Sequence, residues 1–263
     1  MSKITINDII NYKNKKFITC LTAYTVSIAK IIDNHVDIIL IGDSVGTAIY
    51  GMKNTQSVSL EMMKAHGKAV CSNSKKSFTI VDMPYGTYKN KNLALKNAKE
   101  IINYTRCDSV KLEIDEENIH IVKYLTKNNI NVVSHIGVTP QKYSNFNKIK
   151  AIGKNLKEEK QIIKLAKKLE EANSCLIVLE CIYSNIAKKI TDILSIPTIG
   201  IGSSSNCDGQ VMVINDLLET DSTLRRLKFI KSYTNLSKSI EDSVKKYCNE
   251  VINKKFPLKK HSY

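Results

Sequence analysis

The chain contains no tryptophan, only five phenylalanines and only four prolines in 263 residues. With so few phenyl and indole rings, little is available on which nucleic-acid bases could stack. No apolar run approaches the roughly 18 residues of a membrane-spanning helix, so we expect no membrane partner. The N-terminal stretch lacks an apolar block followed by small residues, so we expect no signal peptide and a cytoplasmic protein.

Cysteine is moderately frequent, but its pattern is typical of neither a zinc site nor a disulfide framework. The seven cysteines are odd in number, and no two of them form a Cys-x-x-Cys pair. Cys175 and Cys181 lie in an apolar run, where a thiol serves as a small hydrophobic side chain. We therefore predict reduced thiols, as in a cytoplasmic protein.

Acidic residues are the minority, with 25 Asp and Glu against 40 Lys and Arg, for a net charge of +15. Such a balance fits either a nucleic-acid partner or a lysine-biased surface. The lysines are spread along the chain and mixed with Asn and Ile, which favours a solvated surface and no nucleic-acid partner. A basic nucleic-acid-binding protein without catalysis is kept as the alternative from a different class.

Short apolar runs alternate with amphipathic stretches along the whole chain. The run 38–43 is apolar on both faces and stops at Gly42-Asp43-Ser44, as expected of a strand buried in a parallel sheet. About eight such alternations in one chain predict a (β/α)₈ TIM barrel, with a doubly wound open sheet as the second interpretation. The expected strands are residues 17–24, 38–43, 78–82, 109–113, 131–136, 175–181, 197–201 and 211–218.

The two ends of the chain are expected to be helical additions to a single barrel domain spanning residues 1–263. Thr5 precedes apolar residues at helical spacing in 6–10, which predicts a capped helix covering one end of the fold. Within the barrel, Ser59 is expected to open a helix that runs through residue 70, and Ser184 to cap a short helix that runs to residue 194. The last forty or so residues are basic and carry an apolar face at helical spacing. That face consists of Ile240, Val244, Tyr247 and Val251.

Charged and polar side chains occur where the predicted strands end. Charges inside apolar strands are costly unless they are paired, bound to metal or placed at a solvated mouth. In a parallel barrel the carboxyl ends of all strands meet on one face, so these side chains should converge there. They are Asp43, Ser44, Asp82, Lys111, Glu113, His135, Glu180, Gly202 and Ser203.

Three of these residues, Asp43, Asp82 and Glu113, are hard oxygen donors. No His and Cys cluster has the spacing of a zinc site. Carboxylates around an open site favour Mg²⁺, which keeps waters and accepts substrate oxygens as further ligands. Each acid taken singly has another interpretation, as a helix cap or as a partner of a nearby lysine.

The remaining polar residues each have two interpretations. Lys111 alternates with Glu113 on one strand, so it could hold a substrate carboxylate or form an internal ion pair with Glu113. Ser44 could donate to the same carboxylate or cap the next turn. His135 could donate to substrate or pack as a polar group under a loop.

Glu180 is an acid in the apolar run 177–181, a setting that suits a general base. Its other interpretation is a structural carboxylate that accepts hydrogen bonds from backbone amides. No ordering of Ser, His and Asp suggests a triad, and no P-loop or G-x-G-x-x-G motif is present.

Taken together, the strand-end motifs resemble the ketopantoate hydroxymethyltransferase family. The resemblance covers about residues 5–215 and also touches His261 and Ser262. The motifs that carry it are IGDSVG at 41–46, DMP at 82–84, KLE at 111–113, HIGVTPQ at 135–141, LEC at 179–181, GIG at 200–202 and DGQ at 208–210.

The resemblance implies a barrel of the phosphoenolpyruvate/isocitrate lyase superfamily type, assembled as a homodecamer. It implies transfer of a hydroxymethyl group from 5,10-methylenetetrahydrofolate to 3-methyl-2-oxobutanoate, giving 2-dehydropantoate in the first step of pantothenate biosynthesis. It also implies Mg²⁺ as cofactor and Glu180 as base. The metal would bind Asp43, Asp82 and Glu113, and the keto acid would lie against Asp43, Ser44, Asp82, Lys111 and His135.

Two loops depart from the usual family pattern. In the loop 142–155, Asn147-Lys148 replaces a glycine pair, and Lys154 stands where the family has arginine, whose bidentate contact a lysine cannot reproduce. In the segment 203–228, three serines follow Gly202, and the usual glycines and proline are missing between 218 and 228. Within enzymes, a Mg²⁺-dependent C–C lyase or mutase of the same superfamily, acting on another 2-keto acid, is kept as the alternative.

Overall fold

The computed structural model describes the chain except for residues 1, 145–149 and 221–226. The chain divides into two compact units, Met1–Val213 and Ile214–Tyr263. The first contains all eight strands and every predicted site residue. That residues 214–263 belong to the same domain as the barrel therefore stays a prediction.

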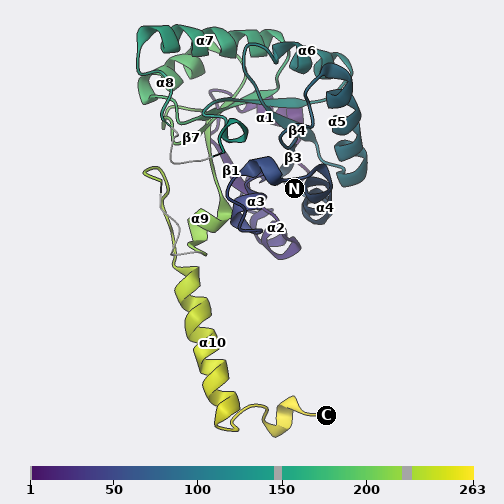
Figure 1. Ribbon diagram of the computed structural model, residues 1–263, viewed down its shortest axis with the longest axis vertical. Helices are drawn as coiled ribbons and strands as arrows, with labels where there is room; N and C mark the ends of the chain where they lie inside the picture. The colour runs from purple at the N-terminus through teal and green to yellow at the C-terminus, as the bar shows by residue number, and fades with distance from the viewer. Residues whose placement is uncertain (1, 145–149, 221–226) are drawn as a thin grey trace. The chain divides into compact units, whose positions relative to one another are not determined.

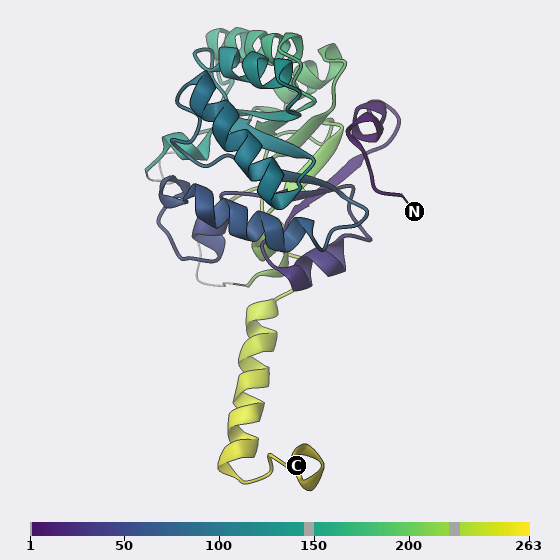
Figure 2. The same ribbon diagram turned by 90° about the vertical axis from the view of Figure 1, so that its right-hand side faces the viewer.

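Eight parallel strands close into a barrel, in which each strand pairs with the next and β8 pairs with β1 (Figures 1 and 2). The TIM barrel is thus confirmed, and the open sheet kept as second interpretation is wrong. The strands are β1 (Ile18–Thr22), β2 (Ile38–Ile41), β3 (Phe78–Asp82), β4 (Ser109–Glu113), β5 (Val132–Gly137), β6 (Leu176–Glu180), β7 (Thr198–Ile201) and β8 (Gly209–Met212).

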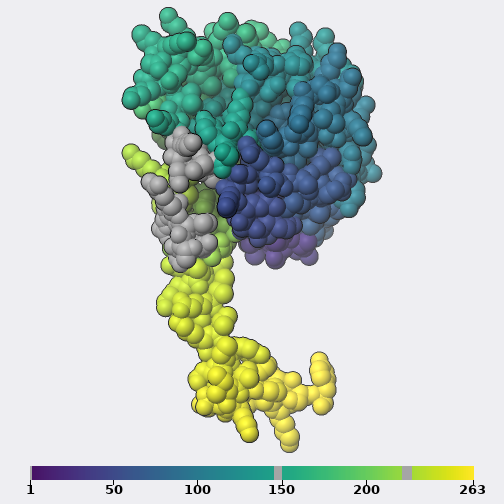
Figure 3. Space-filling view, viewed as in Figure 1, coloured from purple at the N-terminus to yellow at the C-terminus, as the bar shows by residue number. Residues whose placement is uncertain are grey.

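Helices lie around the strands of this unit (Figure 1), and on the face seen in Figure 3 their side chains cover the outside of the barrel. Short helical turns follow β2 and β5 at the carboxyl ends of the strands. The outer helices are α2 (Val26–Ile32), α4 (Leu60–Cys71), α5 (Lys91–Thr105), α6 (Ile119–Lys127), α7 (Leu156–Glu171) and α8 (Ser184–Ile193). The short turns are α3 (Val45–Ala48), η1 (Thr55–Ser57) and η2 (Pro140–Lys142).

Side-chain caps explain where several helices begin. Thr5 Oγ1 accepts a hydrogen bond from Asp8 N at the start of α1 (Ile6–Asn11), and the Asp8 carboxylate accepts one from Thr5 N. Ser59 accepts from the amide of Met62 at the start of α4. Both caps confirm predictions made from the sequence, because a cap satisfies backbone donors that the first helical turn leaves unpaired.

The interior of the barrel is filled with apolar side chains from all strands except β4. Ile9 of α1 joins this core, and Ile4 hydrogen-bonds to Lys76 just before β3, so α1 covers the end where the strands begin. This core fills the barrel from the end where the strands begin, so the charged side chains lie at the end where the strands finish. The strand residues of the core are Ile18, Cys20, Ile38, Leu40, Phe78, Ile80, Val133, Leu176, Val178, Ile199 and Val211.

Two local predictions are wrong. The segment 211–218 is not one strand: β8 ends at Met212, and α9 (Ile214–Leu218) follows. An apolar run of this length fits either element, and pairing of β8 with β1 decided where the strand lies. Ser184 does not cap α8, because its hydroxyl donates to Ser204 Oγ at 3.0 Å and Tyr183 occupies the cap position instead.

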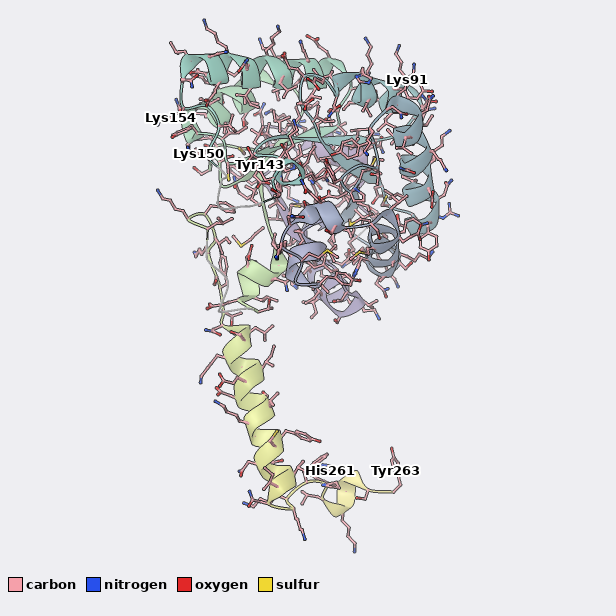
Figure 4. All side chains as sticks on the ribbon, viewed as in Figure 1. Lys91, Tyr143, Lys150, Lys154, His261 and Tyr263 are labelled. Atoms are coloured by element: carbon pink, nitrogen blue, oxygen red, sulfur yellow. The ribbon has the colours of Figure 1, made fainter. Side chains whose placement is uncertain are left out.

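The C-terminal unit contains α9, the helix α10 (Leu236–Ile252) and the turn η4 (Lys259–His261). No residue of α10 is buried, and its side chains project on all sides, as Figure 4 shows together with His261 and Tyr263 beyond it. The predicted apolar face of Ile240, Val244, Tyr247 and Val251 is present and exposed. Nowhere in the described chain is a helix long and apolar enough to cross a membrane.

Candidate active site

The structure brings the predicted site residues to the carboxyl ends of five neighbouring strands, β2 to β6. Parallel register places Asp82 beside Lys111 and Glu113 beside His135. The outcome follows from the barrel, because side chains at the last positions of successive strands share one rim. Asp43 and Ser44 follow β2, Asp82 ends β3, Lys111 and Glu113 lie on β4, His135 lies on β5 and Glu180 ends β6.

Asp82 is held by two donors in the centre of this group. Lys111 Nζ lies 2.7 Å from Asp82 Oδ1, and the two side chains are 7% and 2% exposed. Asp82 Oδ2 accepts a hydrogen bond from the backbone amide of Asp43 at 3.0 Å. Lys111 therefore pairs with the acid on the neighbouring strand, rather than with Glu113 on its own strand.

Acids outnumber bases in this buried cluster, and their proximity shifts the pKa values of its members. Burial, together with the charge of Asp82, raises the pKa of Asp43 to about 7. Burial and the charge of Asp43 also raise the pKa of Glu113 well above its usual range. Burial alone would lower the pKa of Lys111, but the charges of Asp82, Asp43 and Glu113 raise it above its usual value. Burial and mutual repulsion thus disfavour the charged forms of these acids, and a bound cation would favour them.

Gln141, in η2 after β5, contacts two of the acids, and sequence reasoning did not single it out. Its side-chain amide donates to Asp43 Oδ2 at 2.8 Å, and its backbone amide donates to Glu113 Oε2 at 3.0 Å. The only signal was its place in the HIGVTPQ motif. Nothing in a single sequence says that a loop glutamine folds back over strand ends separated from it by 28 and 98 residues.

His135 faces two carboxylates without hydrogen-bonding to either. Its residue is 3% exposed, and neither ring nitrogen has a hydrogen-bond partner within the described chain. Nε2 lies 3.2 Å from Glu180 Oε2, and Nδ1 lies 3.8 Å from Glu113 Oε1. The shorter contact meets an ion-pair distance but lacks hydrogen-bond alignment. A buried unpaired imidazole at the strand ends is a group that a bound ligand would satisfy.

Ser44 does not cap the following helix with its side chain. Its hydroxyl instead lies 2.7 Å from the hydroxyl of Tyr24, a buried residue just after β1 that sequence reasoning also missed. This contact holds Ser44 at the rim of the barrel, beside Asp43. The capping interpretation of Ser44 is therefore wrong, and a role toward substrate stays a prediction.

Glu180 is placed by tight backbone contacts around the end of β6. Its side chain keeps 15% exposure, so it lies at the mouth rather than in the core. Cys181 adopts a left-handed conformation with φ of 49°, which non-glycine residues rarely adopt. Ser203 donates to the carbonyl of Leu179 at 2.7 Å and accepts from the amide of Ile182 at 3.1 Å. The first of the three departing serines thus links the two sides of the Glu180 turn.

A divalent cation fits this donor set. The cluster offers hard carboxyl oxygens, buried acids whose charged forms a cation would stabilise, and an unpaired imidazole. Among the residues that the structure describes, however, no three Asp, Glu, His or Cys side chains form a ready coordination group. Lys111 and Gln141 engage oxygens of Asp82, Asp43 and Glu113 directly. The fit to Mg²⁺ is therefore one of donor chemistry, since carboxylate oxygens are the ligands that this ion prefers.

The loop after β5 contains the other departures from the family pattern. Figure 4 labels Tyr143, Lys150 and Lys154 along this segment, and the amides of Gly153 and Lys154 both donate to Glu158 Oε2 at 2.9 Å. The side chain of Lys154 is exposed. Asn147 and Lys148 lie outside the described residues, as does part of the segment 203–228.

A closed parallel barrel with acids, a lysine and a histidine at its carboxyl rim defines the class: a TIM-barrel enzyme. Solved structures of the same fold belong to the PEP mutase/isocitrate lyase superfamily. The chain matches 2,3-dimethylmalate lyase with a TM-score of 0.59 at 11% identity, over 80% of this chain and 81% of that one. It matches phosphoenolpyruvate phosphomutase from Streptomyces platensis subsp. rosaceus with a TM-score of 0.62 at 8% identity, over 95% and 88%.

The sequence defines the family within this class. Residues 3–259 match the model of the ketopantoate hydroxymethyltransferase family, and the chain belongs to it. A protein of Pelagibacter ubique named 3-methyl-2-oxobutanoate hydroxymethyltransferase is 47% identical over 100% of both chains. A protein of Helicobacter pylori with the same name is 41% identical over 100% of this chain and 97% of its own. The family predicted from the strand-end motifs is confirmed.

Proposed function

We propose that this protein transfers a hydroxymethyl group from 5,10-methylenetetrahydrofolate to 3-methyl-2-oxobutanoate, giving 2-dehydropantoate and tetrahydrofolate. The observation that carries the proposal is the acid cluster beside Glu180 and His135, in a chain 47% identical over its full length to a protein of that name. The same name implies that the product, 2-dehydropantoate, enters pantothenate biosynthesis.

Asp43, Asp82 and Glu113 would hold Mg²⁺. A structure titled as phosphonopyruvate hydrolase in complex with oxalate and Mg²⁺ shares the fold, with a TM-score of 0.60 at 11% identity, over 94% of this chain and 99% of that one. That protein places a small carboxylate ligand and the metal in a barrel of this kind. When bound, the metal would act as a Lewis acid toward the oxygens of the keto acid.

The other residues supply binding and proton transfer. Lys111, which is paired with Asp82, and Ser44, which is next to Asp43 in the chain, would hold the substrate carboxylate. His135 would donate to a substrate oxygen through one of its two ring nitrogens, neither of which has a hydrogen-bond partner in the described chain. Glu180, 3.2 Å from His135, would take the proton from C3 of the keto acid.

The reaction balances without an oxidant or reductant. The electron pair left on C3 attacks the methylene carbon carried by the folate, and a C–C bond forms. One of the two C–N bonds of the methylene bridge breaks as this C–C bond forms. Water then supplies the new hydroxyl group as the second C–N bond breaks. The two folate nitrogens take up the proton lost from C3 and the proton released by water, and tetrahydrofolate leaves. We further propose that the enzyme works as a cytoplasmic homodecamer, as the family resemblance implies, which light scattering would test.

The test is proton NMR of 3-methyl-2-oxobutanoate in D₂O with the protein and Mg²⁺. We expect loss of the C3 proton signal, and formation of 2-dehydropantoate once 5,10-methylenetetrahydrofolate is added. Glu180→Gln removes the base, so the exchange rate should fall by about 10²–10⁴-fold. Glu171→Gln makes the same change at the exposed end of α7 and should leave the rate unchanged.

Three results would contradict the proposal in different ways. Exchange that survives in Glu180→Gln would exclude Glu180 as the base. Exchange that survives in EDTA would exclude the metal. Folded protein that exchanges no proton of this substrate, but cleaves another 2-keto acid in a substrate screen, would favour the lyase alternative.

A further inference from the structure

Every hydrogen-bonding group of Gln141 is engaged, in a residue that is 2% exposed. The side-chain nitrogen donates to Asp43 Oδ2 at 2.8 Å and to the carbonyl of Met83 at 3.0 Å. The side-chain oxygen accepts from the hydroxyl of Tyr88. The carbonyl of Gln141 itself accepts from Gln56 Nε2 at 2.9 Å. One buried amide thus joins the ends of β2 and β3 to the loops that follow β2 and β5.

These contacts allow only one orientation of the amide. If the oxygen and nitrogen exchanged places, the oxygen would face the Asp43 carboxylate and the Met83 carbonyl, two acceptors. A glutamate at this position would meet the same two acceptors with a negative charge. The site therefore requires a neutral side chain with two donors, which glutamine supplies at this length.

The backbone of Gln141 extends the same arrangement to a second acid. Its amide donates to Glu113 Oε2 at 3.0 Å while its side chain holds Asp43 Oδ2. The other oxygens, Asp43 Oδ1 and Glu113 Oε1, accept no hydrogen bond from the described residues. One residue thus restrains an oxygen on each acid and leaves the second oxygen of each without a hydrogen bond from the described chain, with His135 Nδ1 3.8 Å from Glu113 Oε1.

We propose that Gln141 is a positioning residue of the metal site, which orients Asp43 and Glu113 so that their free oxygens can receive the cation. The inference rests on the proposed assignment of Asp43, Asp82 and Glu113 to Mg²⁺. Groups that hydrogen-bond to metal ligands fix their orientation, and replacing such a group weakens metal affinity by about 10–100-fold. The side-chain contribution of Gln141 is the part that mutation can remove.

Gln141→Met keeps the length of the side chain and the backbone amide but removes both donors to Asp43 and Met83. We expect the Kd for Mg²⁺, from calorimetric titration of the full chain, to rise by about 10–100-fold. We also expect saturating Mg²⁺ to restore a large part of the C3 exchange rate, because the metal itself then orients the acids. A merely structural defect would not respond to Mg²⁺ in this way.

Two comparison variants separate positioning from packing. Tyr88→Phe removes the hydroxyl that supports the Gln141 oxygen but leaves both donors in place. It should lower Tm, because the Gln141 side-chain oxygen loses the hydrogen bond that it accepts from Tyr88. The Kd for Mg²⁺ should change by less than about threefold, because both hydrogen bonds donated by the Gln141 side chain remain. Gln161→Met makes the matched change on the exposed face of α7 and should alter neither quantity.

Each outcome decides between the two proposals. Weak binding in Gln141→Met that Mg²⁺ rescues supports the positioning role. If the wild type binds Mg²⁺ and Asp43→Asn abolishes that binding, while Gln141→Met binds normally, the positioning role is overturned and the metal site stands. If Gln141→Met and Tyr88→Phe lose affinity equally, Gln141 acts through packing alone. If the wild type binds no Mg²⁺, the metal site fails, and the role of Gln141 fails with it.

Discussion

Lys111 and Asp82 form a buried ion pair across β4 and β3, with Lys111 Nζ 2.7 Å from Asp82 Oδ1. Further acids lie near this pair, and the charges of Asp43 and Glu113 add to that of Asp82 in raising the pKa of Lys111. A single buried cation is thus surrounded by three carboxylates. The stability of the rim and its capacity to bind an anionic substrate depend on the same lysine.

Replacing Lys111 by Met should therefore damage both properties. Removing one partner of a buried ion pair leaves the other charge uncompensated, at a cost of about 3–5 kcal/mol. We expect the free energy of unfolding to fall by about that amount in urea titrations with EDTA present. We also expect the C3 exchange of 3-methyl-2-oxobutanoate to be lost, because no other buried cation faces Asp82 in the described chain.

The double variant Lys111→Met/Asp82→Asn separates the two effects. It removes both charges of the pair, so much of the lost stability should return. Exchange should stay absent, since neither the cation for the substrate nor the acid for the metal is present. Recovery of exchange in the double variant would show that Lys111 serves only to balance Asp82.

Gly137 controls how closely β5 approaches Glu180. Its φ is +99°, and a Cβ built on it would lie 2.2 Å from the carbonyl oxygen of Glu180 and 2.8 Å from Ile182 Cγ1. Gly137→Ala must therefore displace the backbone that carries the proposed base. A shift of about 1 Å in a catalytic group can lower the rate by about 10²-fold, which we expect for C3 exchange in this variant.

Gly86→Ala is the matched control for Gly137→Ala. Gly86 also has a positive φ, +81°, but the nearest atom to a Cβ there is Lys89 Cε at 3.5 Å. Both alanines carry the strain of the left-handed region, about 1–2 kcal/mol. Only Gly137→Ala should lower the exchange rate strongly. Equal loss of activity in both variants would assign the effect to backbone strain rather than to the Glu180 contact.

The sequence allowed the barrel and the rim acids to be predicted, because both depend on local pattern. Apolar runs ending in Asp43 or Asp82 indicate strands whose carboxyl ends carry charge, and parallel closure then brings those ends together. Thr5 and Ser59 were predictable as caps for the same reason, since each contacts a backbone amide three residues away.

Contacts that depend on register or on loop path could not be predicted. The partner of Lys111 follows from the alignment of β3 with β4, which no pattern within β4 reveals. Gln141 reaches Asp43 only because η2 folds over the rim. The position of Gly209 in β8 also depends on register, because a Cβ there would come 2.3 Å from the Ile18 carbonyl oxygen.

Asp33 offers a test of fold stability far from the proposed chemistry. It follows α2 and accepts hydrogen bonds from the backbone amides of Lys75 at 2.7 Å, Lys76 at 3.1 Å and Ser77 at 2.9 Å, which lead into β3. Asp33→Asn replaces one acceptor oxygen by a donor that faces these amides. We expect the free energy of unfolding at pH 7 to fall by about 1–3 kcal/mol in urea titrations.

The pH dependence of this loss identifies its cause. Burial alone would raise the pKa of Asp33, but the amides of Ser77, Lys75 and Lys76 lower it below its usual value. A lowered pKa in the folded state contributes stability above the unfolded value of about 3.9, and this stability disappears as pH falls through the folded pKa. The difference in unfolding free energy between wild type and Asp33→Asn should therefore be full at pH 7 and shrink at acidic pH.

Asp192→Asn, at an exposed ion pair with Lys188, should change stability by less than about 1 kcal/mol at either pH. A difference for Asp33→Asn that stays constant down to the most acidic pH at which the protein folds would mean that packing, not the charge of Asp33, stabilises this junction.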